Sequence, residues 1–487
     1  MAVAEDMFFL DPQADGTLQH QLQRLVSEGV LSGRFPPGAR LPSSRKLARH
    51  LGISRITVTL AYTELVAGDY LTARGRSGYY VSETAPRLPQ YEEVIHRQDK
   101  VDWASRIGTS FSESLRLEKP TDWRSYPYPF IYGQADKRLF DHSNWRQCAL
   151  MALGQRDFEA LTDDYQERDD PKLVEFIARH SLPRRGILAK SDEILVTLGA
   201  QNALWLAAQV LLKKGDTAVR EAPCYPSLRD ILDQSPAAVT ALPVDSGGLD
   251  PDAVPEQADV VFVTPSHQCP TAATMPVDRR RALLERAARD NLLIVEDDYE
   301  FEMSFLSAPS PALKSLDRDG RVIYVGSFSK SLFPGLRLGY LVGSAPFIRE
   351  ARALRATVLR HPPGHIQRTA AYFLSLGHYD AQIRRMAQAF ERRRKVMEEA
   401  IAAHGLTIAG QDTLGGSSFW MSAPPTVDTR HLAEALRDSG VLIEPGEAFF
   451  DGVARAKHFY RLAYSSISRA AIPEGLARVS AAINRLA

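Results

Sequence analysis

The chain has 487 residues, of which 44% are hydrophobic and 24% are charged, which allows more than one domain and excludes a disordered or fibrous protein. Lysine plus arginine equals aspartate plus glutamate at 59 each, so any nucleic-acid surface must be local. The chain has three cysteines, Cys148, Cys224 and Cys269, which are too few for a disulfide framework. The first residues are acidic where a signal peptide is basic, and no apolar run approaches about 20 residues. We therefore expect a cytoplasmic protein without a membrane span.

The first segment has the pattern of a winged helix-turn-helix. Apolar residues at helical spacing predict helices over residues 18–32, 43–51 and 55–68. Ser43 and Ser44 offer an N-cap for the second helix, and Gly52 ends it. Two short strands, residues 70–72 and 79–81, flank a basic tip that contains glycine. Three helices followed by a hairpin are the winged helix-turn-helix order.

The charge of this segment supports DNA binding. Residues 17–82 hold nine lysine and arginine residues against three acidic ones, a net charge of +6 in a neutral chain. A small basic segment of this kind is typical of a DNA-binding domain. We predict a DNA-binding domain over residues 1–83 and a linker over residues 84–124, where periodicity is lost. The predicted DNA contacts lie on the second and third helices and on the wing, at Arg45, Arg55, Thr57, Thr59, Arg74, Gly75 and Arg76. The arginines at 384–385 and 392–394 form an alternative basic patch, which we interpret as a solvated helix face.

From about residue 125 the pattern changes to alternating strands and helices. Apolar runs at 194–197, 259–263, 292–295 and 321–325 alternate with helical stretches such as 278–290. This alternation predicts an α/β domain over residues 125–487, with a parallel sheet covered by helices on both sides. Residues from about 380 onward indicate a smaller α+β subdomain.

Polar residues follow these predicted strands at the point where each strand ends. Asp297 and Tyr299 follow the third run, Lys330 and Arg337 follow the fourth, and Gly199 opens a helix after the first. The carboxyl ends of parallel strands meet at one edge of a sheet, so these groups should converge. Such a site suits a small anionic aromatic aldehyde. The lysine can form an imine with the aldehyde and the carboxylate can pair with a ring nitrogen, whereas the hydroxyls, the arginine and the helix N-terminus can hold a phosphate.

Two longer motifs give a family resemblance. Residues 327–340, SFSKSLFPGLRLGY, resemble the Schiff-base signature of fold-type I aminotransferases, which have a central mixed, mostly parallel sheet. Residues 36–45, PPGARLPSSR, with 51–55, LGISR, resemble a GntR-type winged helix. Together they resemble the MocR/GabR regulators over nearly the whole chain. The resemblance implies pyridoxal 5′-phosphate (PLP) as cofactor, a double-stranded DNA operator as partner, and a homodimer, with a head-to-tail exchange of winged helices as one arrangement.

The resemblance also implies roles for individual residues. Lys330 would form the internal aldimine with PLP, Asp297 would pair with the ring nitrogen, Tyr299 would bond the ring 3-oxygen, and Tyr225 would stack on the ring. The phosphate would be held by Ala200, Gln201, Ser327, Ser329 and Arg337, and by Tyr165 of a neighbouring subunit. Arg461 would bind the carboxylate of an effector through two hydrogen bonds. No metal site is expected.

Two departures from the aminotransferase pattern lie near the ring oxygen. Cys269 stands where the family has an asparagine near the ring oxygen, and Ala272 stands where it has a glycine. The first change removes a hydrogen bond that tunes the ring, so efficient transamination becomes doubtful while cofactor binding does not.

Three functional hypotheses follow from these features. The first is a regulator that senses an amine or amino acid through external aldimine formation, and it is preferred because an enzyme needs no DNA-binding domain. The second is a working aminotransferase tethered to DNA, and the third makes PLP itself the signal. The effector remains open among γ-aminobutyrate, taurine, another amino acid and PLP.

Overall fold

The computed structural model describes residues 2–11, 16–86, 101–112, 117, 119–164, 167–307, 310–410, 415–451 and 457–487. The chain divides into two compact units, Met1–Thr109 and Ser110–Ala487, with the boundary inside the stretch predicted as a linker. Within the described ranges, no helix combines the length and apolar character needed to cross a membrane. The same ranges contain no cluster of three or more histidine, cysteine or acidic residues that could hold a metal ion.

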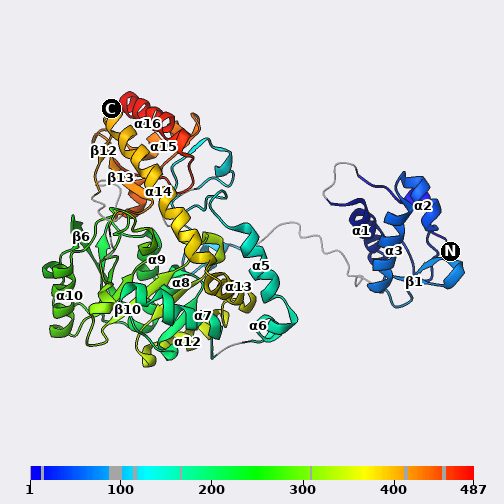
Figure 1. Ribbon diagram of the computed structural model, residues 1–487, viewed down its shortest axis with the longest axis horizontal. Coiled ribbons are helices and arrows are strands. Elements are labelled where there is room, and N and C mark those ends of the chain that lie inside the picture. Colours follow the sequence, from blue (N-terminus) through cyan, green and yellow to red (C-terminus); the bar gives the residue numbers. More distant parts are fainter. Residues whose placement is uncertain are drawn as a thin grey trace. The chain divides into compact units, whose positions relative to one another are not determined.

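The first unit contains the three predicted helices and the predicted hairpin (Figure 1). The side chains of Thr17, Ser43 and Ser54 accept hydrogen bonds from backbone amides and so cap the three helices. The two strands pair antiparallel across a short turn, which makes the wing. The elements are α1 Leu18–Leu31, α2 Ser44–Leu51, α3 Arg55–Ala67, β1 Leu71–Ala73 and β2 Tyr79–Val81, followed by α4 Trp103–Arg106.

One face of α3 makes the centre of this unit's core. Val58, Ala61 and Tyr62 are fully buried among residues of α1, α2 and the wing. The Tyr62 hydroxyl donates to the Pro42 carbonyl at 3.1 Å, which ties α3 to the segment before α2. The opposite face of α3 carries Ile56 and Leu60, which are exposed.

The second unit is built on a sheet of eight strands in the order β4-β11-β10-β9-β8-β5-β6-β7. β11 pairs antiparallel with both β4 and β10, and β7 pairs antiparallel with β6, whereas the other neighbours are parallel. The prediction of a mixed, mostly parallel sheet is therefore confirmed. The strands are β4 Ile194–Thr197, β5 Thr217–Ala222, β6 Ala238–Asp245, β7 Gly248–Leu249, β8 Val260–Val263, β9 Leu293–Asp297, β10 Val322–Ser327 and β11 Gly339–Val342.

Helices cover both faces of this sheet (Figure 1). Alternate strand residues such as Ile323 and Val325 pack under α8, α9 and α12, whereas Val322 packs on the other face against α10 and α11. Near β4 and β11 that other face is covered by α7 and α13. The helices are α5 His142–Ala152, α6 Phe158–Thr162, α7 Pro171–Phe176, α8 Ala200–Leu211, α9 Pro226–Asp233, α10 Val277–Arg289, α11 Leu313–Leu316, α12 Ala345–Leu359 and α13 Gly364–Ser375.

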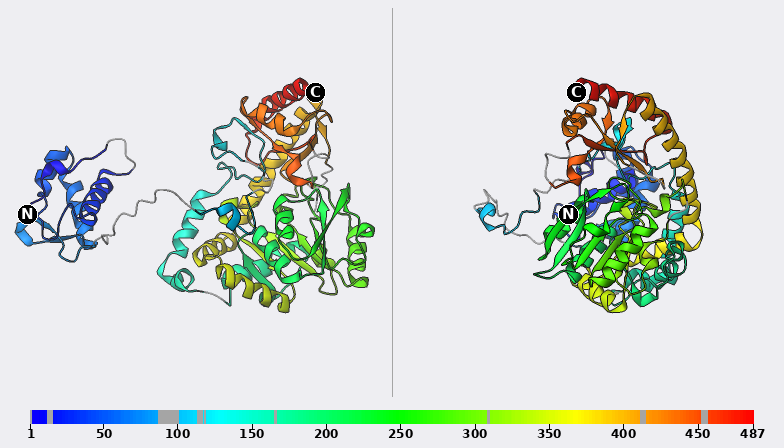
Figure 2. Two further views of the ribbon diagram at one scale, coloured as in Figure 1. Left: turned by 180° about the vertical axis from the view of Figure 1, so that it is seen from behind. Right: turned by 90° about the vertical axis from the view of Figure 1, so that its left-hand side faces the viewer.

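The C-terminal part forms the predicted smaller α+β subdomain, drawn in yellow, orange and red (Figure 2). Its antiparallel sheet has the order β12-β13-β16-β15 and packs with the helices in a separate core. A short strand from the start of the unit, β3 Tyr128–Pro129, joins it by pairing with β14. The elements are α14 His378–Ala403, β12 Thr407–Ile408, β13 Ser418–Ser422, α15 Thr429–Arg437, β14 Val441–Leu442, β15 Glu444–Pro445, β16 Phe459–Ala463 and α16 Ile472–Leu486.

Two interpretations of the sequence need correction. Trp123, placed in the linker, is buried against Ile131 and Leu442, so the end of that stretch belongs to the second unit. Arg393 and Arg394 are also buried rather than solvated. Arg393 donates to the carbonyl of residue 465 at 2.6 Å and Arg394 to that of residue 415 at 2.8 Å, because loop carbonyls covered by α14 need donors.

Candidate functional site

A cavity of about 330 Å³ lies at the carboxyl ends of the sheet strands. Strands β4, β5, β8, β9 and β10 end at it, and β16 of the small subdomain closes it from another side. The predicted residues that line it together are Ala200, Gln201, Tyr225, Asp297, Tyr299, Ser327, Ser329, Lys330, Arg337 and Arg461. Tyr165 lies outside the described residues.

Lys330 follows β10 and points its amine into a confined space. The Nζ atom lies 4.0 Å from the centroid of the Tyr132 ring, and a Cβ on Gly133 would come within 2.2 Å of it. Burial lowers the pKa of Lys330 to about 8; Glu300 opposes this effect and Arg461 adds to it. About a tenth of the amine is therefore neutral at pH 7, far more than for an ordinary lysine, and the neutral amine is the form that attacks a carbonyl.

Asp297 ends the neighbouring strand β9 and is almost fully buried. Its Oδ1 atom has no hydrogen-bond partner among the described residues. Burial raises the pKa of Asp297 to about 7, and the nearby carboxylates of Asp298 and Glu221 push in the same direction. A buried oxygen without a partner is costly, so this atom is suited to a cationic N–H donor brought in by a ligand.

The far end of the cavity is arranged for an anion. Gly199 has φ +83° and precedes α8, whose first residues, Ala200 and Gln201, line the cavity. Arg337 donates to the Leu198 carbonyl at 2.9 Å, which holds its guanidinium 3.3 Å from where a Cβ on Gly199 would be. The start of a helix with unpaired amides, beside an arginine, is a ready site for a phosphate.

Tyr225 and Cys269 form part of an apolar wall with Phe449. Burial raises the pKa of Cys269 to about 12, so the group that replaces the family's asparagine remains a thiol, a weak donor. Ala272, which replaces the glycine, has φ +60°, a conformation that favours glycine. Both departures noted in the sequence therefore have structural consequences.

Arg461 lies on β16 opposite Glu444 of β15, and its Nε donates to the Glu444 carboxylate at 2.8 Å. Both side chains are buried, and the guanidinium carbon lies 4.1 Å from the Tyr132 ring centroid. Although burial alone would lower the pKa of Arg461, Glu444 holds it above its ordinary value. Sequence reasoning missed Tyr132 and Glu444, because nothing in their local sequence marks them.

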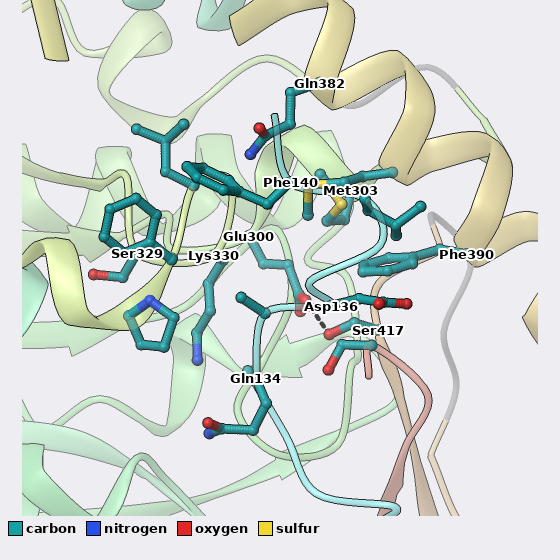
Figure 3. Close-up of a pocket in the computed structure, with 18 residues that line it drawn as sticks. Gln134, Asp136, Phe140, Glu300, Met303, Ser329, Lys330, Gln382, Phe390 and Ser417 are labelled. Atoms are coloured by element: carbon teal, nitrogen blue, oxygen red, sulfur yellow. Dashed lines mark hydrogen bonds between the residues drawn. The ribbon is translucent and has the colours of Figure 1, made fainter. Parts of the chain in front are cut away.

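A second, much smaller cavity of about 30 Å³ lies along the Lys330 side chain (Figure 3). Glu300 and Asp136 line it, and the Ser417 hydroxyl donates to the Glu300 carboxylate. This space is about the size of one water molecule. It therefore adds a buried acid near the lysine rather than a second ligand site.

In the first unit, the predicted DNA contacts lie on α2, α3 and the wing. Arg45 and Arg55 are exposed, and Arg55 Nε donates to the Ser44 hydroxyl at 3.4 Å. The hydroxyls of Thr57 and Thr59 already donate to Ser54 and to the Arg55 carbonyl.

The wing residues lie at the tip of the hairpin. The Arg74 guanidinium carbon lies 4.6 Å from the centroid of the Tyr80 ring, and Gly75 has φ +47°. The side chain of Arg76 is outside the described part of the structure. The described wing therefore presents at least one exposed arginine beside its turn.

Comparison with known proteins agrees with both halves of this architecture. Residues 149–479 match the family model described as aminotransferase class I and II, and residues 18–81 match the bacterial regulatory proteins of the gntR family. The chain is 31% identical over 402 residues to the probable rhizopine catabolism regulatory protein MocR of Rhizobium meliloti, covering 82% of this chain and 80% of that one. The chain belongs to the MocR family of transcription regulators.

This MocR-family regulator has other similar relatives. It is 58% identical over 483 residues to the HTH-type transcriptional regulator TauR of Rhodobacter capsulatus, which covers 99% of this chain and 100% of that protein. Among solved structures, a Pyrococcus horikoshii kynurenine aminotransferase crystallised with PMP is similar over 78% of this chain and 98% of that one, with 26% identity and a TM-score of 0.71. The regulator therefore joins a GntR-type winged helix to an aminotransferase fold, as the resemblance implied.

Proposed function

We propose that this regulator holds PLP on Lys330 and uses it to sense a primary amine that carries an anionic group. The observation that carries the proposal is the single cavity in which Lys330, the unpartnered Asp297 oxygen and Arg461 meet. Because the chain also contains a DNA-binding helix-turn-helix, a ligand bound at this site could regulate DNA binding. When bound, PLP supplies an aldehyde carbon at which one amine can replace another.

The side chains of the cavity fit the parts of PLP. Asp297 is suited to hold the proton of the ring nitrogen, and Tyr299 is suited to bond the ring 3-oxygen. Tyr225 offers its ring for stacking. The phosphate is assigned to the start of α8, the two hydroxyls and the arginine, namely Ala200, Gln201, Ser327, Ser329 and Arg337.

Arg461 is proposed to bind the anionic end of the effector. Its Nε is engaged by Glu444, so its terminal nitrogens are the donors that remain for an anion. The Tyr132 ring lies against both this guanidinium and the Lys330 amine, so both cations border the same part of the cavity. An effector whose amine takes the place of the Lys330 amine at the cofactor can therefore present an anionic group to Arg461 in the same cavity.

A homodimer is also proposed. The segment from α5 to α6 exposes five large apolar side chains, and a monomer rarely leaves such a patch in water. These residues are Leu150, Met151, Leu153, Phe158 and Leu161. Tyr165, a few residues further along the chain, remains proposed as a phosphate contact across the dimer. Light scattering on the purified protein would detect the dimer, and a monomeric mass would contradict it.

Catalysis of transamination is the alternative function. A partly neutral Lys330 beside a buried acid, Glu300, could serve as a general base, which favours this reading. The thiol of Cys269 in the asparagine's place argues against efficient turnover. Steady-state turnover with an amino acid and a keto acid separates the two, since only an enzyme completes many cycles.

The absorbance spectrum of the purified protein tests the proposal directly. Wild type reconstituted with PLP is expected to show a visible band, and borohydride reduction should bleach this band and leave the cofactor covalently attached to the peptide containing Lys330. Lys330→Ala should lack both, whereas Lys119→Ala, which changes another lysine of the cavity, should retain both. A Lys330→Ala protein that still traps the cofactor in this cavity would refute the assignment.

The regulatory half of the proposal is tested on DNA. An amine that shifts the visible band should also change binding of the protein to its operator. Operator affinity measured with and without PLP, in the absence of any amine, distinguishes effector sensing from PLP acting as the signal. An amine that shifts the band but leaves DNA binding unchanged would contradict sensing.

A further inference from the structure

The recognition helix α3 exposes an apolar stripe where a solvated helix would carry polar residues. Ile56 is 72% exposed and Leu60 is 48% exposed, one helical turn apart. Both lie on the side opposite the buried residues Val58, Ala61 and Leu65. Neither side chain contributes to the core of this unit, and both are available for contact with a partner on the outer face of the helix.

The surroundings of the stripe are basic. Arg45, Lys46 and Arg49 of α2 are exposed, and Arg55 precedes Ile56 at the start of α3. The first turn of α3 contains no acidic residue. The acid further along the helix, Glu64, accepts a hydrogen bond from Gln19 of α1 at 3.1 Å, which places it on the α1 side of α3.

An apolar centre with cationic edges is complementary to the major groove of DNA. The groove is bordered by phosphates, and its one apolar group is the C5-methyl of thymine. In helix-turn-helix proteins, the N-terminal side chains of the recognition helix reach the base edges. Ile56 is the second residue of α3, and its methyl groups can contact a thymine methyl without any unpaired polar atom.

We propose that Ile56, together with Leu60, reads thymine C5-methyl groups in the operator. Ile56 then contributes sequence preference, while the arginines around it contribute affinity through phosphates. Neither residue is among the DNA contacts predicted from the sequence, which are arginines, threonines and one glycine.

The test removes one methyl group from the DNA and one side chain from the protein. Full-length, PLP-loaded wild type is used to select duplexes from a randomised pool, and each thymine of the selected site is replaced by deoxyuridine. Fluorescence anisotropy at fixed salt then measures the Kd. Loss of a buried methyl is expected to weaken binding about fourfold at one or more thymines.

Ile56→Ala is expected to lose this discrimination, binding the thymine and uracil duplexes with similar affinity. Leu60→Ala should lose it at a neighbouring thymine. Phe9→Ala is the matched control, because Phe9 is an 84% exposed apolar residue of the same unit outside α3, and it should retain the full uracil penalty. Because all three side chains are exposed, circular dichroism of the variants should match wild type.

Two results would overturn the proposal. One is a uracil penalty in Ile56→Ala and Leu60→Ala that equals the wild-type penalty at every thymine. The other is unchanged DNA binding by both variants with a changed oligomer mass, which would assign the stripe to a contact between protein chains.

Discussion

Asp297→Asn should make the PLP-free protein more stable, although the residue is proposed to hold the cofactor. The substitution keeps the shape of the side chain and removes its ability to ionise. In wild type this carboxyl group is buried, and its Oδ1 has no partner among the described residues. Burial therefore raises its pKa to about 7, whereas an unfolded aspartate has a pKa of about 3.9.

The magnitude follows from linkage between protonation and folding. Because the folded pKa lies above the unfolded one, wild type loses stability as the pH rises from about 4 to about 7, and the loss is complete above that. The full slope is about 1.4 kcal/mol per pH unit and flattens as the pH approaches 7, so between pH 5 and pH 7 wild type should lose about 2 kcal/mol relative to the variant. The advantage of Asp297→Asn should therefore grow over this range and then level off.

Denaturant unfolding of the PLP-free proteins at pH 5, 6, 7 and 8 measures this difference in the free energy of unfolding. Other titrating groups are shared by the two proteins and largely cancel in the comparison. Added PLP should reverse the order, because a cationic ring nitrogen against Oδ1 would stabilise wild type and not the variant. A difference between the proteins that does not change from pH 5 to pH 8 would refute the burial argument.

Three further changes have expected outcomes. Gly133→Ala places a Cβ 2.2 Å from Lys330 Nζ at a position with φ +69°, so PLP affinity, measured by the visible band, should fall by about tenfold or more while the protein stays folded. Ala272→Gly relieves a φ of +60° and should raise the free energy of unfolding by about 0.5–1 kcal/mol in denaturant titrations; a loss would contradict the strain. Glu444→Gln removes the charge beside Arg461, so spectral titrations should give an anionic amine about a tenfold larger preference over a matched neutral amine.

Much of the fold could be predicted because its central strands are continuous apolar runs. β4, β8, β9 and β10 are buried on both faces and are rich in β-branched residues. β5 was missed because it contains Arg220 and Glu221, whose polar side chains are buried and paired through tertiary contacts. β11 was missed because it begins at the end of the segment 327–340 that resembles the Schiff-base signature, and its sequence gives no sign that the strand runs antiparallel.

The residues of the candidate site also differ in whether the sequence could predict them. Residues that directly follow predicted strands, such as Asp297 and Lys330, could be placed because strand ends share one edge of the sheet. Leu117, Lys119 and Tyr132 reach the same cavity from segments that precede the sheet in sequence, and only the tertiary structure brings them there. Sequence periodicity carries no information on such long-range packing.

The position of the two cations also bears on how a small ligand could act on DNA binding. Lys330 follows β10 of the large subdomain, whereas Arg461 belongs to β16 of the small one. An amine bound only at the Lys330 end of the cavity contacts one subdomain, but an amine whose anionic end also reaches Arg461 links both and must bind best in one relative arrangement of them. A ligand shifts an equilibrium only through its differential affinity for the two states. We therefore infer that the anionic group, rather than the amine, converts occupancy of the cavity into a change of conformation.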